Sequence, residues 1–386
     1  MRIAYVTHTR FPTEKAHGMQ VAQVCHALSR LGHQVTLVTP TVENSIHEDP
    51  HAYYGLPHSF DVLTLEHFDA RTSPWVPGFL HFRVSMRAYR RELARYFASE
   101  KPDLIYARSP LLLSELLATG VPVILELHSL PRVGRWIFVR NCHRCRSVVC
   151  LTSLLKHELQ SWGVKEENTI VEGDAVDLDR FRDPVPLYEA KEQWKLPRTA
   201  PVIAYVGTLV TQNTIEKGVP ELIEAFVLLQ KKGIKFFGWI VGGPHEWVET
   251  YKARAKELGI DAHIRFEGAI RVEKVPSALS AVDVCVYPAP RSAHPYFTRD
   301  TSPLKLFEYM AAEKPIVCAD LPPLRDVVDE KLVEFCEPGD AQSLAHAIGK
   351  VLKNPDAARE KARRAFLAMG GRTWEKRMKR ILDAAS

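Results

Sequence analysis

The segment TSPLKLFEYMAAEKPIV, residues 301–317, places a cation where a helix normally favours an anion. Ser302 is a good N-cap residue and Pro303 a good first helical residue, so the pattern predicts a helix that begins here. Free N–H groups and the dipole make this end of a helix positive, which favours acidic side chains. The sequence instead has Lys305 there and delays the acid to Glu308. A lysine beside free N–H groups predicts a bound anion, most simply a diphosphate.

Glu308 is expected to lie on the same helix face as Lys305, because the two residues are three positions apart. A carboxylate can accept hydrogen bonds from two adjacent hydroxyls, as ribose presents them. The pair would therefore fit a nucleoside diphosphate. A surface Lys–Glu pair with no ligand is the alternative, and these residues alone do not decide between the two.

A second cation is predicted for the same diphosphate in YVGTLVTQNTIEKG, residues 205–218. A strand is expected to end at Gly207, which lets the backbone approach a ligand closely. Lys217 then precedes an amphipathic helix. A solvated loop lysine is the alternative interpretation.

Two residues of the N-terminal half are also candidates. Gly18 stands between the first predicted strand and its helix, as a single glycine rather than a GxGxxG fingerprint. His128 directly follows the predicted strand in VPVILELHS, at the strand end where ligands bind in parallel sheets. It could donate a hydrogen bond to a sugar hydroxyl or to charge that develops at a reacting centre. A structural hydrogen bond is the alternative for His128.

The elements that must position these residues form two series of apolar strands separated by amphipathic helices. Continuous apolar strands of this kind predict parallel sheets covered on both faces, so the fold class is α/β with two Rossmann-like, doubly wound domains. We place the first domain at 1–180 and the second at 200–372, with a C-terminal helix at 373–386 that completes the first. Their strand-end loops are expected to face each other across a cleft.

Composition agrees with this organisation. The 386 residues are 46% hydrophobic, enough for two cores, and the net charge of +5 is mild. No apolar run is long enough to span a membrane, and the N-terminus is strand-like rather than a signal peptide. Seven cysteines in apolar runs predict free thiols in the cytoplasm. Cys142 and Cys145 form a CxxC without a second ligand pair, which argues against zinc.

These stretches, in this order, resemble glycosyltransferase family 4 over almost the whole chain. HGMQVAQVCHALSRLGHQVTLVTP is similar to the family's glycine loop, first helix and second strand, and LELHS to its histidine segment. GDAVDLDRF resembles the interdomain loop, and GTLVTQNTIEKG and TSPLKLFEYMAAEKPIV resemble the two donor-site segments. The resemblance implies a GT-B fold and a retaining transferase that uses a nucleotide-diphosphate sugar.

The resemblance also implies roles for individual residues. Glu308 would bind the nucleotide ribose and Asp300 hydroxyls of the donor sugar. The diphosphate would lie near Lys217 and the amides of Thr301 and Ser302. Residues of the N-terminal half would complete the site from the other domain, with Gly18 toward the diphosphate or sugar and His128 beside the transferred bond. The residues with catalytic roles would be His128, Lys217 and Asp300.

Three positions depart from the family pattern. Asp300 replaces the usual glutamate and is shorter, and Thr208 stands where many members have an arginine beside the phosphates. Glu313 replaces a glycine after the helix, which predicts altered geometry there. The Asp-x-Asp at Asp177 and Asp179 lies in the joining loop, so we interpret it as structural. We expect no metal ligands and no cofactor other than the sugar nucleotide used as substrate.

The resulting prediction is a metal-independent hexosyltransferase that acts from a UDP- or GDP-linked sugar on a hydroxyl acceptor. The acceptor would be a glycan or a lipid-linked sugar of the cell envelope. A nucleotide-sugar epimerase of the same fold and an inactive nucleotide-sugar-binding protein remain alternatives. An epimerase would work without an acceptor, and a pure binder would release no nucleotide.

Residues 72–82 and the predicted helix that follows them have the composition of a membrane-binding surface. The segment TSPWVPGFLHF, residues 72–82, is rich in aromatic residues, and Arg83, Arg87 and Arg91 follow at helical spacing. Such a stripe suits an anionic surface, which predicts a cytoplasmic protein that is peripheral at the inner face of a membrane. A solvated helix face is the alternative. Nucleic acid is not an expected partner, because neither a known module nor a strongly basic domain is present.

Overall fold

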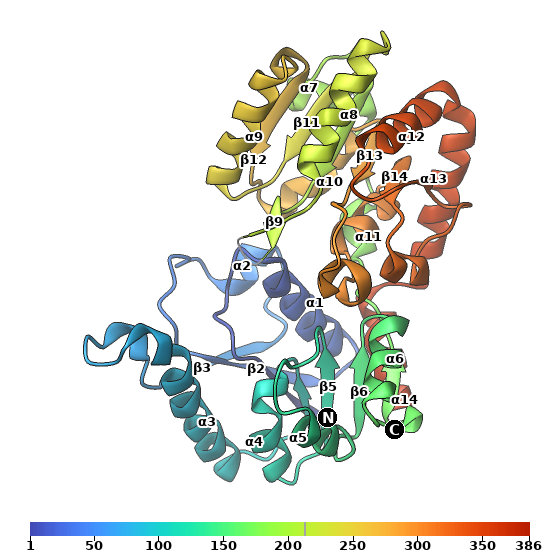
Figure 1. Ribbon diagram of the computed structural model, residues 1–386. Coiled ribbons are helices and arrows are strands. Elements are labelled where there is room, and N and C mark those ends of the chain that lie inside the picture. Colours follow the sequence, from blue (N-terminus) through green and yellow to red (C-terminus); the bar gives the residue numbers. More distant parts are fainter. Residues whose placement is uncertain (212–213) are drawn as a thin grey trace. The chain divides into compact units, whose positions relative to one another are not determined.

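The computed structural model describes residues 1–211 and 214–386, which form two compact units (Figure 1). Unit 1 consists of Met1–Asp174 and Trp374–Ser386, and unit 2 of Ala175–Thr373. Each unit contains one parallel sheet with helices packed on it. The fold class predicted from the sequence, with two Rossmann-like domains, is therefore confirmed.

Unit 1 has a seven-stranded sheet in the order β3-β2-β1-β4-β5-β6-β7, and every neighbouring pair is parallel. β4, β5 and β6 are buried along their whole length, as expected of strands covered on both faces. The strands are β1 (Arg2–Val6), β2 (Gln34–Pro40), β3 (Asp61–Leu65), β4 (Leu104–Ala107), β5 (Val123–Leu127), β6 (Ser147–Cys150) and β7 (Thr169–Val171).

Helices cover this sheet, and one of them comes from the far end of the sequence. The C-terminal helix α14 packs against α1, although more than three hundred residues separate them. The helices of unit 1 are α1 (Ala16–Arg30), α2 (Pro50–Tyr54), α3 (His81–Ser99), α4 (Leu113–Ala118), α5 (Arg135–Cys142), α6 (Ser153–Ser161) and α14 (Trp374–Ala384).

Unit 2 has a six-stranded parallel sheet in the order β12-β11-β8-β13-β14-β15, and a separate β9–β10 hairpin. The strands are β8 (Val202–Val206), β9 (Val210–Thr211), β10 (Ile215–Glu216), β11 (Phe237–Val241), β12 (Ile264–Gly268), β13 (Val284–Tyr287), β14 (Ile316–Ala319) and β15 (Glu334–Cys336). The helices are α7 (Leu187–Gln193), α8 (Val219–Lys231), α9 (His245–Glu257), α10 (Val275–Ser280), α11 (Leu304–Ala311), α12 (Ala341–Lys353) and α13 (Pro355–Met369).

The interval 180–200, which the sequence left between the two domains, is part of unit 2. Its helix α7 packs against α10, and the ammonium of the buried Lys191 lies 2.6 Å from the Asp283 carboxylate. The chain enters unit 2 at Asp174/Ala175 and leaves it at Thr373/Trp374.

Each sheet has one point where the strand order changes direction along the chain. In unit 1 this point lies between β1 and β4, and in unit 2 between β8 and β13. Loops that leave such a pair diverge to opposite faces of the sheet, which opens space for ligands at the strand ends. The loops after these four strands are therefore where functional residues are expected.

The remaining predictions about composition can be compared with the structure directly. All seven cysteines are free and buried, as predicted. Among the described helices, none combines the length and the apolar character that crossing a membrane requires.

A buried ion pair attaches α14 to the sheet of unit 1. The Arg377 guanidinium donates to the Glu126 carboxylate over 2.8 Å and to the Gly173 carbonyl over 2.6 Å. Both charged side chains are essentially inaccessible to solvent. Burial alone would raise the pKa of Glu126, but Arg377 and further hydrogen bonds outweigh burial and hold it well below its usual value. Nearer the surface, Arg380 binds Glu172 through two hydrogen bonds.

Replacement of Arg377 by Met should lower the free energy of unfolding by about 3–5 kcal/mol, because Glu126 would remain buried without its counter-ion. Urea denaturation followed by circular dichroism measures the loss. Arg380→Met removes a half-exposed ion pair from the same helix and should cost about 1 kcal/mol or less. Equal losses for the two variants would contradict the special importance of the buried pair.

Candidate functional site

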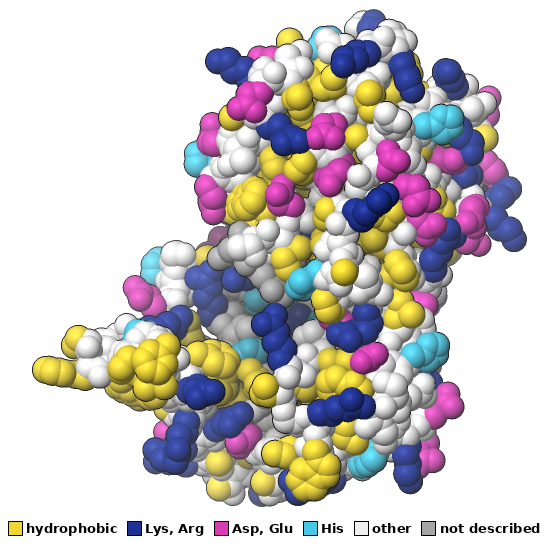
Figure 2. All heavy atoms as spheres, in the orientation of Figure 1, with side chains coloured by type: hydrophobic (Ala, Val, Ile, Leu, Met, Phe, Trp, Pro, Cys, Tyr) yellow, Lys and Arg dark blue, Asp and Glu magenta, His cyan; other side chains and the backbone are white. Residues whose placement is uncertain are grey.

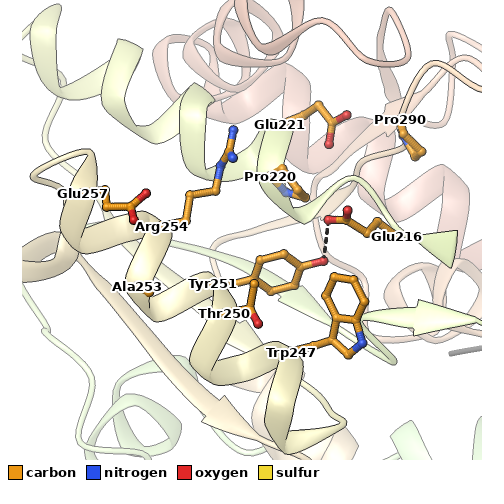
Figure 3. Close-up of a pocket in the computed structure, with 10 residues that line it drawn as sticks. All are labelled: Glu216, Pro220, Glu221, Trp247, Thr250, Tyr251, Ala253, Arg254, Glu257 and Pro290. Atoms are coloured by element: carbon orange, nitrogen blue, oxygen red, sulfur yellow. Dashed lines mark hydrogen bonds between the residues drawn. The ribbon is translucent and has the colours of Figure 1, made fainter. Parts of the chain in front are cut away.

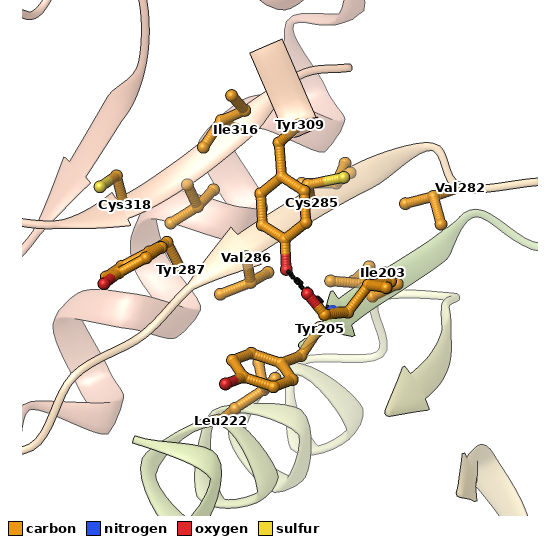
Figure 4. Close-up of a cluster of buried hydrophobic side chains, with 14 of the residues drawn as sticks. Ile203, Tyr205, Leu222, Val282, Cys285, Val286, Tyr287, Tyr309, Ile316 and Cys318 are labelled. Atoms are coloured by element: carbon orange, nitrogen blue, oxygen red, sulfur yellow. Dashed lines mark hydrogen bonds between the residues drawn. The ribbon is translucent and has the colours of Figure 1, made fainter. Parts of the chain in front are cut away.

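Lys305 lies at the point in unit 2 where the strand order changes direction. Its ammonium donates to the Tyr205 hydroxyl over 2.5 Å and lies 4.2 Å from the centroid of that ring. The centroid of the Tyr287 ring is 5.0 Å away. Tyr205 and Tyr287 belong to the neighbouring strands β8 and β13 and are part of the buried core (Figure 4). Two tyrosine rings therefore support this ammonium.

Lys217 occupies a similar environment directly before α8. Its ammonium donates to the Tyr296 hydroxyl and lies 3.7 Å from the centroid of the Tyr296 ring. Only 5% of the residue is exposed to solvent. Tyr296 begins a short π-helical segment, Tyr296–Asp300, in the connection between β13 and α11. Both predicted lysines are thus held against tyrosines by the loops at the same sheet edge.

Close backbone contacts bring these loops together. Gly218 has a φ of 82°, and a Cβ atom there would lie 2.5 Å from the backbone nitrogen of Ala289. No side chain fits at that distance, so Gly218 lets the loop before α8 pack against the loop after β13. On the other side, a Cβ atom at Gly207 would lie 3.0 Å from Lys305 Cε. Gly207, predicted as a point of close approach, therefore lies directly beside Lys305.

The surrounding protein disfavours the charged forms of the two lysines. Burial lowers the pKa of Lys217 to about 7. The pKa of Lys305 lies well below its usual value, because burial and then the charge of Lys217 outweigh the opposite effect of Glu308. In the described part of the chain, neither ammonium lies within ion-pair distance of a carboxylate. An anion is therefore the partner that this arrangement favours.

The helix that follows begins one residue later than predicted. α11 has Pro303 as its N-cap, without a side-chain capping bond, so the prediction of Ser302 as N-cap and Pro303 as first helical residue is wrong. The N–H groups of the first turn still lack intrahelical acceptors, as in any helix. Thr301 is buried and Ser302 half-buried, directly before this turn.

Glu308 lies one turn along the same helix and is half-buried. Its carboxylate is 3.5 Å from the Arg180 guanidinium, which also donates to the Val272 carbonyl over 2.6 Å. Burial raises the pKa of Glu308 more than Arg180 and Lys305 lower it. The sequence did not point to Arg180, because it lies more than one hundred residues earlier in the chain.

Asp300 is also paired with an arginine. Arg299 Nε donates to Oδ1 over 2.6 Å and Nη2 donates to Oδ2 over 3.2 Å, and only 9% of the Asp300 side chain is exposed. A ligand hydroxyl that bound Asp300 would have to share the carboxylate with this guanidinium. The predicted contact with the donor sugar stays a prediction.

In unit 1, His128 belongs to a hydrogen-bonded network at the end of β5. Its Nδ1 accepts from the Arg108 guanidinium over 3.2 Å, and its Nε2 donates to the Glu126 carboxylate over 2.7 Å. These partners require a neutral ring protonated at Nε2. Burial, with Arg108, lowers the pKa of His128 to about 4, against the opposite effect of Glu126. Both nitrogens already have partners, which favours the structural alternative for this residue.

Arg108 makes the corresponding edge of unit 1 electropositive. It follows β4, and His8 follows the neighbouring β1. Burial, together with Arg108, lowers the pKa of His8 to about 4 and that of His17 to about 3, so both rings are neutral near pH 7. The sequence analysis did not select Arg108, because no motif surrounds it.

Gly18 is explained by packing within unit 1. A Cβ atom there would lie 2.1 Å from the Tyr54 hydroxyl and 2.6 Å from Thr13 Cγ2. The Tyr54 hydroxyl donates to the Thr13 carbonyl and accepts from the Thr13 N–H, both over 2.8 Å. These contacts require a glycine without any ligand, and the predicted approach to a phosphate or sugar stays a prediction.

Comparisons with known proteins identify the family of the chain. A profile for glycosyl transferases group 1 matches residues 188–383, and a profile for glycosyltransferase family 4 matches residues 18–180. The chain belongs to glycosyltransferase family 4. The resemblance stated from the sequence is thereby confirmed.

This family 4 chain spans about half of the length of the curated relatives that it matches. The 2-deoxystreptamine glucosyltransferase of Streptomyces kanamyceticus is 27% identical over 227 residues, which is 58% of this chain and 54% of the relative. A GDP-mannose-dependent phosphatidylinositol monomannoside mannosyltransferase of Mycolicibacterium smegmatis is 27% identical over 201 residues, 52% and 49% of the two chains.

Solved structures show that the family 4 chain has the GT-B fold. Sucrose-phosphate synthase from Thermosynechococcus elongatus aligns over 100% of both chains with a TM-score of 0.76 and 20% identity. Anabaena HepE, solved in complex with UDP-glucose, aligns over 100% of both chains with a TM-score of 0.71 and 17% identity.

Two of the departures from the family pattern, Thr208 and Glu313, and the Asp-x-Asp can also be compared with the structure. Thr208 is exposed, and its carbonyl accepts from Tyr205, so no arginine-like cation stands at that position. Glu313 keeps the left-handed backbone of a glycine, with a φ of 52°, so the predicted change of geometry does not occur. Asp177 accepts from the Asp179 N–H and so caps the short helix Leu178–Phe181. This capping agrees with the structural interpretation of the Asp-x-Asp.

A pocket of about 540 Å³ lies beside the β9–β10 hairpin (Figure 3). Glu216, Glu221 and Glu257 contribute carboxylates, and Tyr251 donates to Glu216 over 2.9 Å. The carboxylates make this pocket unsuitable for a diphosphate, although Glu216 directly precedes Lys217. The two lysines, and not this pocket, therefore remain the candidate site for an anion.

The affinity for a nucleotide-diphosphate sugar should fall as the pH rises above about 7. The diphosphate stabilises the ammonium of Lys217, whose pKa in the free protein is about 7, so binding at higher pH must take up a proton. Calorimetry at pH 6.5 and 8.5 in buffers of different ionisation enthalpy measures both effects. Lys217→Arg stays charged throughout and should flatten the dependence. An unchanged pH dependence in that variant would contradict the assignment.

Proposed function

We propose that the chain is a retaining, metal-independent glycosyltransferase that moves a hexosyl group from a nucleotide-diphosphate sugar to a hydroxyl acceptor. The observation that carries the proposal is the pair Lys217, which is buried, and Lys305, which is half-buried. Both are supported by tyrosine rings and lack carboxylate partners in the described residues. Such a pair is costly unless an anion occupies the space beside it. A diphosphate supplies the required negative charge.

The lysines would act on the leaving group. When the bond between the sugar and the diphosphate breaks, negative charge develops on the phosphate oxygen that was bonded to the sugar. Lys217, Lys305 and the first N–H groups of α11 are fixed before the reaction, and such preorganised groups stabilise developing charge most effectively. The same groups would remove the need for a divalent metal at the diphosphate.

A direct displacement on one face of the sugar accounts for retention without a protein nucleophile. The acceptor hydroxyl oxygen bonds to the anomeric carbon as the diphosphate departs from the same face. His128 already donates to Glu126 and accepts from Arg108, so it has no free nitrogen for the acceptor proton. We therefore assign that proton to the departing phosphate oxygen, and a positioning role to His128.

Glu308 would bind the hydroxyls of the nucleotide ribose. It lies one helical turn from Lys305, and Arg180 keeps its carboxylate in place. The relatives named above use GDP-mannose or transfer glucose, and HepE was solved with UDP-glucose. Both UDP and GDP therefore remain candidates for the nucleotide, and a glycan or lipid-linked sugar of the cell envelope remains the proposed acceptor.

In the presence of EDTA, either UDP or GDP should raise the melting temperature of the full chain, and ADP should not. Glu308→Gln should weaken binding of the nucleotide about 10- to 100-fold, the cost of losing a charged hydrogen-bond partner, while inorganic pyrophosphate binds as before. Differential scanning fluorimetry and calorimetry measure these effects. Glu313→Gln, at the exposed end of the same helix, is the matched control.

The same protein sample separates the alternatives. Release of UDP or GDP from the donor, with the anomeric configuration retained in the product, supports a retaining transferase. If NMR showed that the sugar nucleotide is converted to an epimer without any acceptor, the protein would be an epimerase. Nucleotide binding without turnover would indicate an inactive binder. If neither nucleotide stabilised the chain, the proposal would be wrong.

We further propose that α3 and the segment before it bind an anionic membrane surface. Arg83, Arg87 and Arg91 are exposed, whereas Met86, Tyr89 and Leu93 are buried on the opposite side of α3. In the preceding segment, Trp75 is 89% and Phe79 is 83% exposed. Figure 2 shows hydrophobic side chains on this segment and basic side chains over α3. Exposed aromatic residues beside a basic stripe suit the headgroup region of a membrane.

Replacement of both Arg87 and Arg91 by Ser should reduce binding to vesicles that contain phosphatidylserine, since each basic residue near such a surface contributes about 1 kcal/mol. Vesicle sedimentation measures the bound fraction. The pair Arg359→Ser and Arg363→Ser removes the same charge at the same spacing from α13 and is the control. Equal binding of both double variants would contradict the proposed surface.

A further inference from the structure

Three potential metal ligands of unit 1 lie together at the start of α2. Asp49 is the N-cap of this helix, His51 is in its first turn, and His58 follows its end. One ligand atom from each residue lies within 4.8 Å of the others. The Asp49 Oδ1 atom is 3.7 Å from His51 Nδ1 and 3.6 Å from His58 Nε2. The two imidazole ring centroids are 4.4 Å apart.

The protonation of His51 leaves its Nδ1 lone pair directed into this cluster. Its Nε2 lies 3.0 Å from the Phe60 carbonyl oxygen, which can only accept, so Nε2 must carry the proton. Nδ1 is then an acceptor, and it is buried without a hydrogen-bond partner. The His51 side chain is only 6% exposed. A carbonyl that holds one ring nitrogen while the other faces a cluster is the arrangement of metal-bound histidines.

Asp49 is also held in place by the backbone. Its Oδ1 accepts from the N–H groups of His51 and Ala52, both over 3.0 Å. His58 is the exposed member of the set, with 77% of its side chain accessible to solvent. Two of the three ligands are thus preorganised, and the third can adjust.

We propose that Asp49, His51 and His58 bind a divalent transition-metal ion of the zinc class through one carboxylate oxygen and two imidazole nitrogens. Zinc bonds of about 2.0–2.2 Å in a tetrahedron separate the ligand atoms by about 3.4 Å. The two distances from Asp49 Oδ1, 3.7 and 3.6 Å, are close to this value. A small rotation of the exposed His58 closes the difference. Two imidazoles and one carboxylate suit zinc, and harder ions such as Mg²⁺ prefer oxygen ligands. The sequence analysis expected no metal ligands and did not select these three residues.

The proposed ion would stabilise the loop before α1. α2 ends at Tyr54, whose hydroxyl makes both hydrogen bonds to the backbone of Thr13. Gly18, at the start of α1, packs against the same hydroxyl. An ion at the N-terminus of α2 would therefore restrict motion of Tyr54 and of residues 13–18. We expect it to be a structural site, independent of the diphosphate chemistry proposed for unit 2.

The test uses the full chain, freed of metal with a chelator and titrated with Zn²⁺ by calorimetry. The wild-type protein should bind one equivalent, and Co²⁺ in its place should give the intense visible bands of a tetrahedral site. His58→Gln removes an exposed ligand, and Asp49→Asn removes the charge but keeps a good N-cap. Each variant should bind Zn²⁺ at least about 10-fold more weakly, since even outer ligand partners contribute this much. His47→Gln, an exposed histidine nearby in sequence, is the control and should bind normally.

Circular dichroism of the metal-free variants confirms that each is folded. Stoichiometric binding in the wild type that is lost in both ligand variants, with slower hydrogen exchange at Thr13 when Zn²⁺ is bound, supports the proposal. Absence of stoichiometric binding would overturn it. Binding that is equal in the wild type, His58→Gln and Asp49→Asn would also overturn it, because the ion would then lie at other residues.

Discussion

Two ammonium groups held inside unit 2 without carboxylate partners among the described residues determine what that unit can bind. A fall in the pKa of Lys217 from 10.5 to about 7 corresponds to roughly 5 kcal/mol, at about 1.4 kcal/mol for each pH unit. The charged lysine carries this cost in the folded protein, and either loss of the proton or a bound anion removes it. The tyrosines beneath the lysines reduce the cost through their ring faces and hydroxyls, but they supply no negative charge. The two lysines therefore favour an anionic ligand, since the described residues supply no carboxylate beside them.

The position of these lysines follows from the strand order. β8 and β13 are neighbours in the sheet, but the connections that leave them run to opposite sides, so their ends leave room that other loops do not fill. Gly218 then brings Lys217 into this space, because only a residue without a side chain can approach Ala289 so closely. Lys305 reaches the same space from the first turn of α11. The strand order thus determines where the space at the ends of β8 and β13 lies, and the close contact at Gly218 places Lys217 beside it.

The sequence was sufficient for the fold class and for both lysines, because apolar periodicity and an unusual charge at a helix start are local signals. It was not sufficient for their surroundings. Tyr205 and Tyr287 were expected only as strand residues, and their role as a support for Lys305 depends on the pairing of strands far apart in the chain. The pairing of Glu308 with Arg180 was missed because the two residues lie far apart in the chain. The cluster at Asp49 is local in sequence, but its spacing did not match a known metal-binding motif. Helix boundaries shifted by one residue, since Pro303 serves as well for an N-cap as for a first helical position.

In unit 1, by contrast, the buried charge of Glu126 is fully paired within the protein. This difference distinguishes structural groups from candidate functional groups. Glu126 is fully buried, yet it accepts hydrogen bonds from Tyr106, His128 and Arg377, so its charge is completely compensated. A ligand could bind Glu126 only by displacing one of these donors, at a cost that such a contact would not recover. His128, although it stands at a strand end where ligands are expected, is committed to the same network. Position at a strand end therefore suggests function only when the group lacks a partner of opposite charge, as Lys217 and Lys305 do among the described residues.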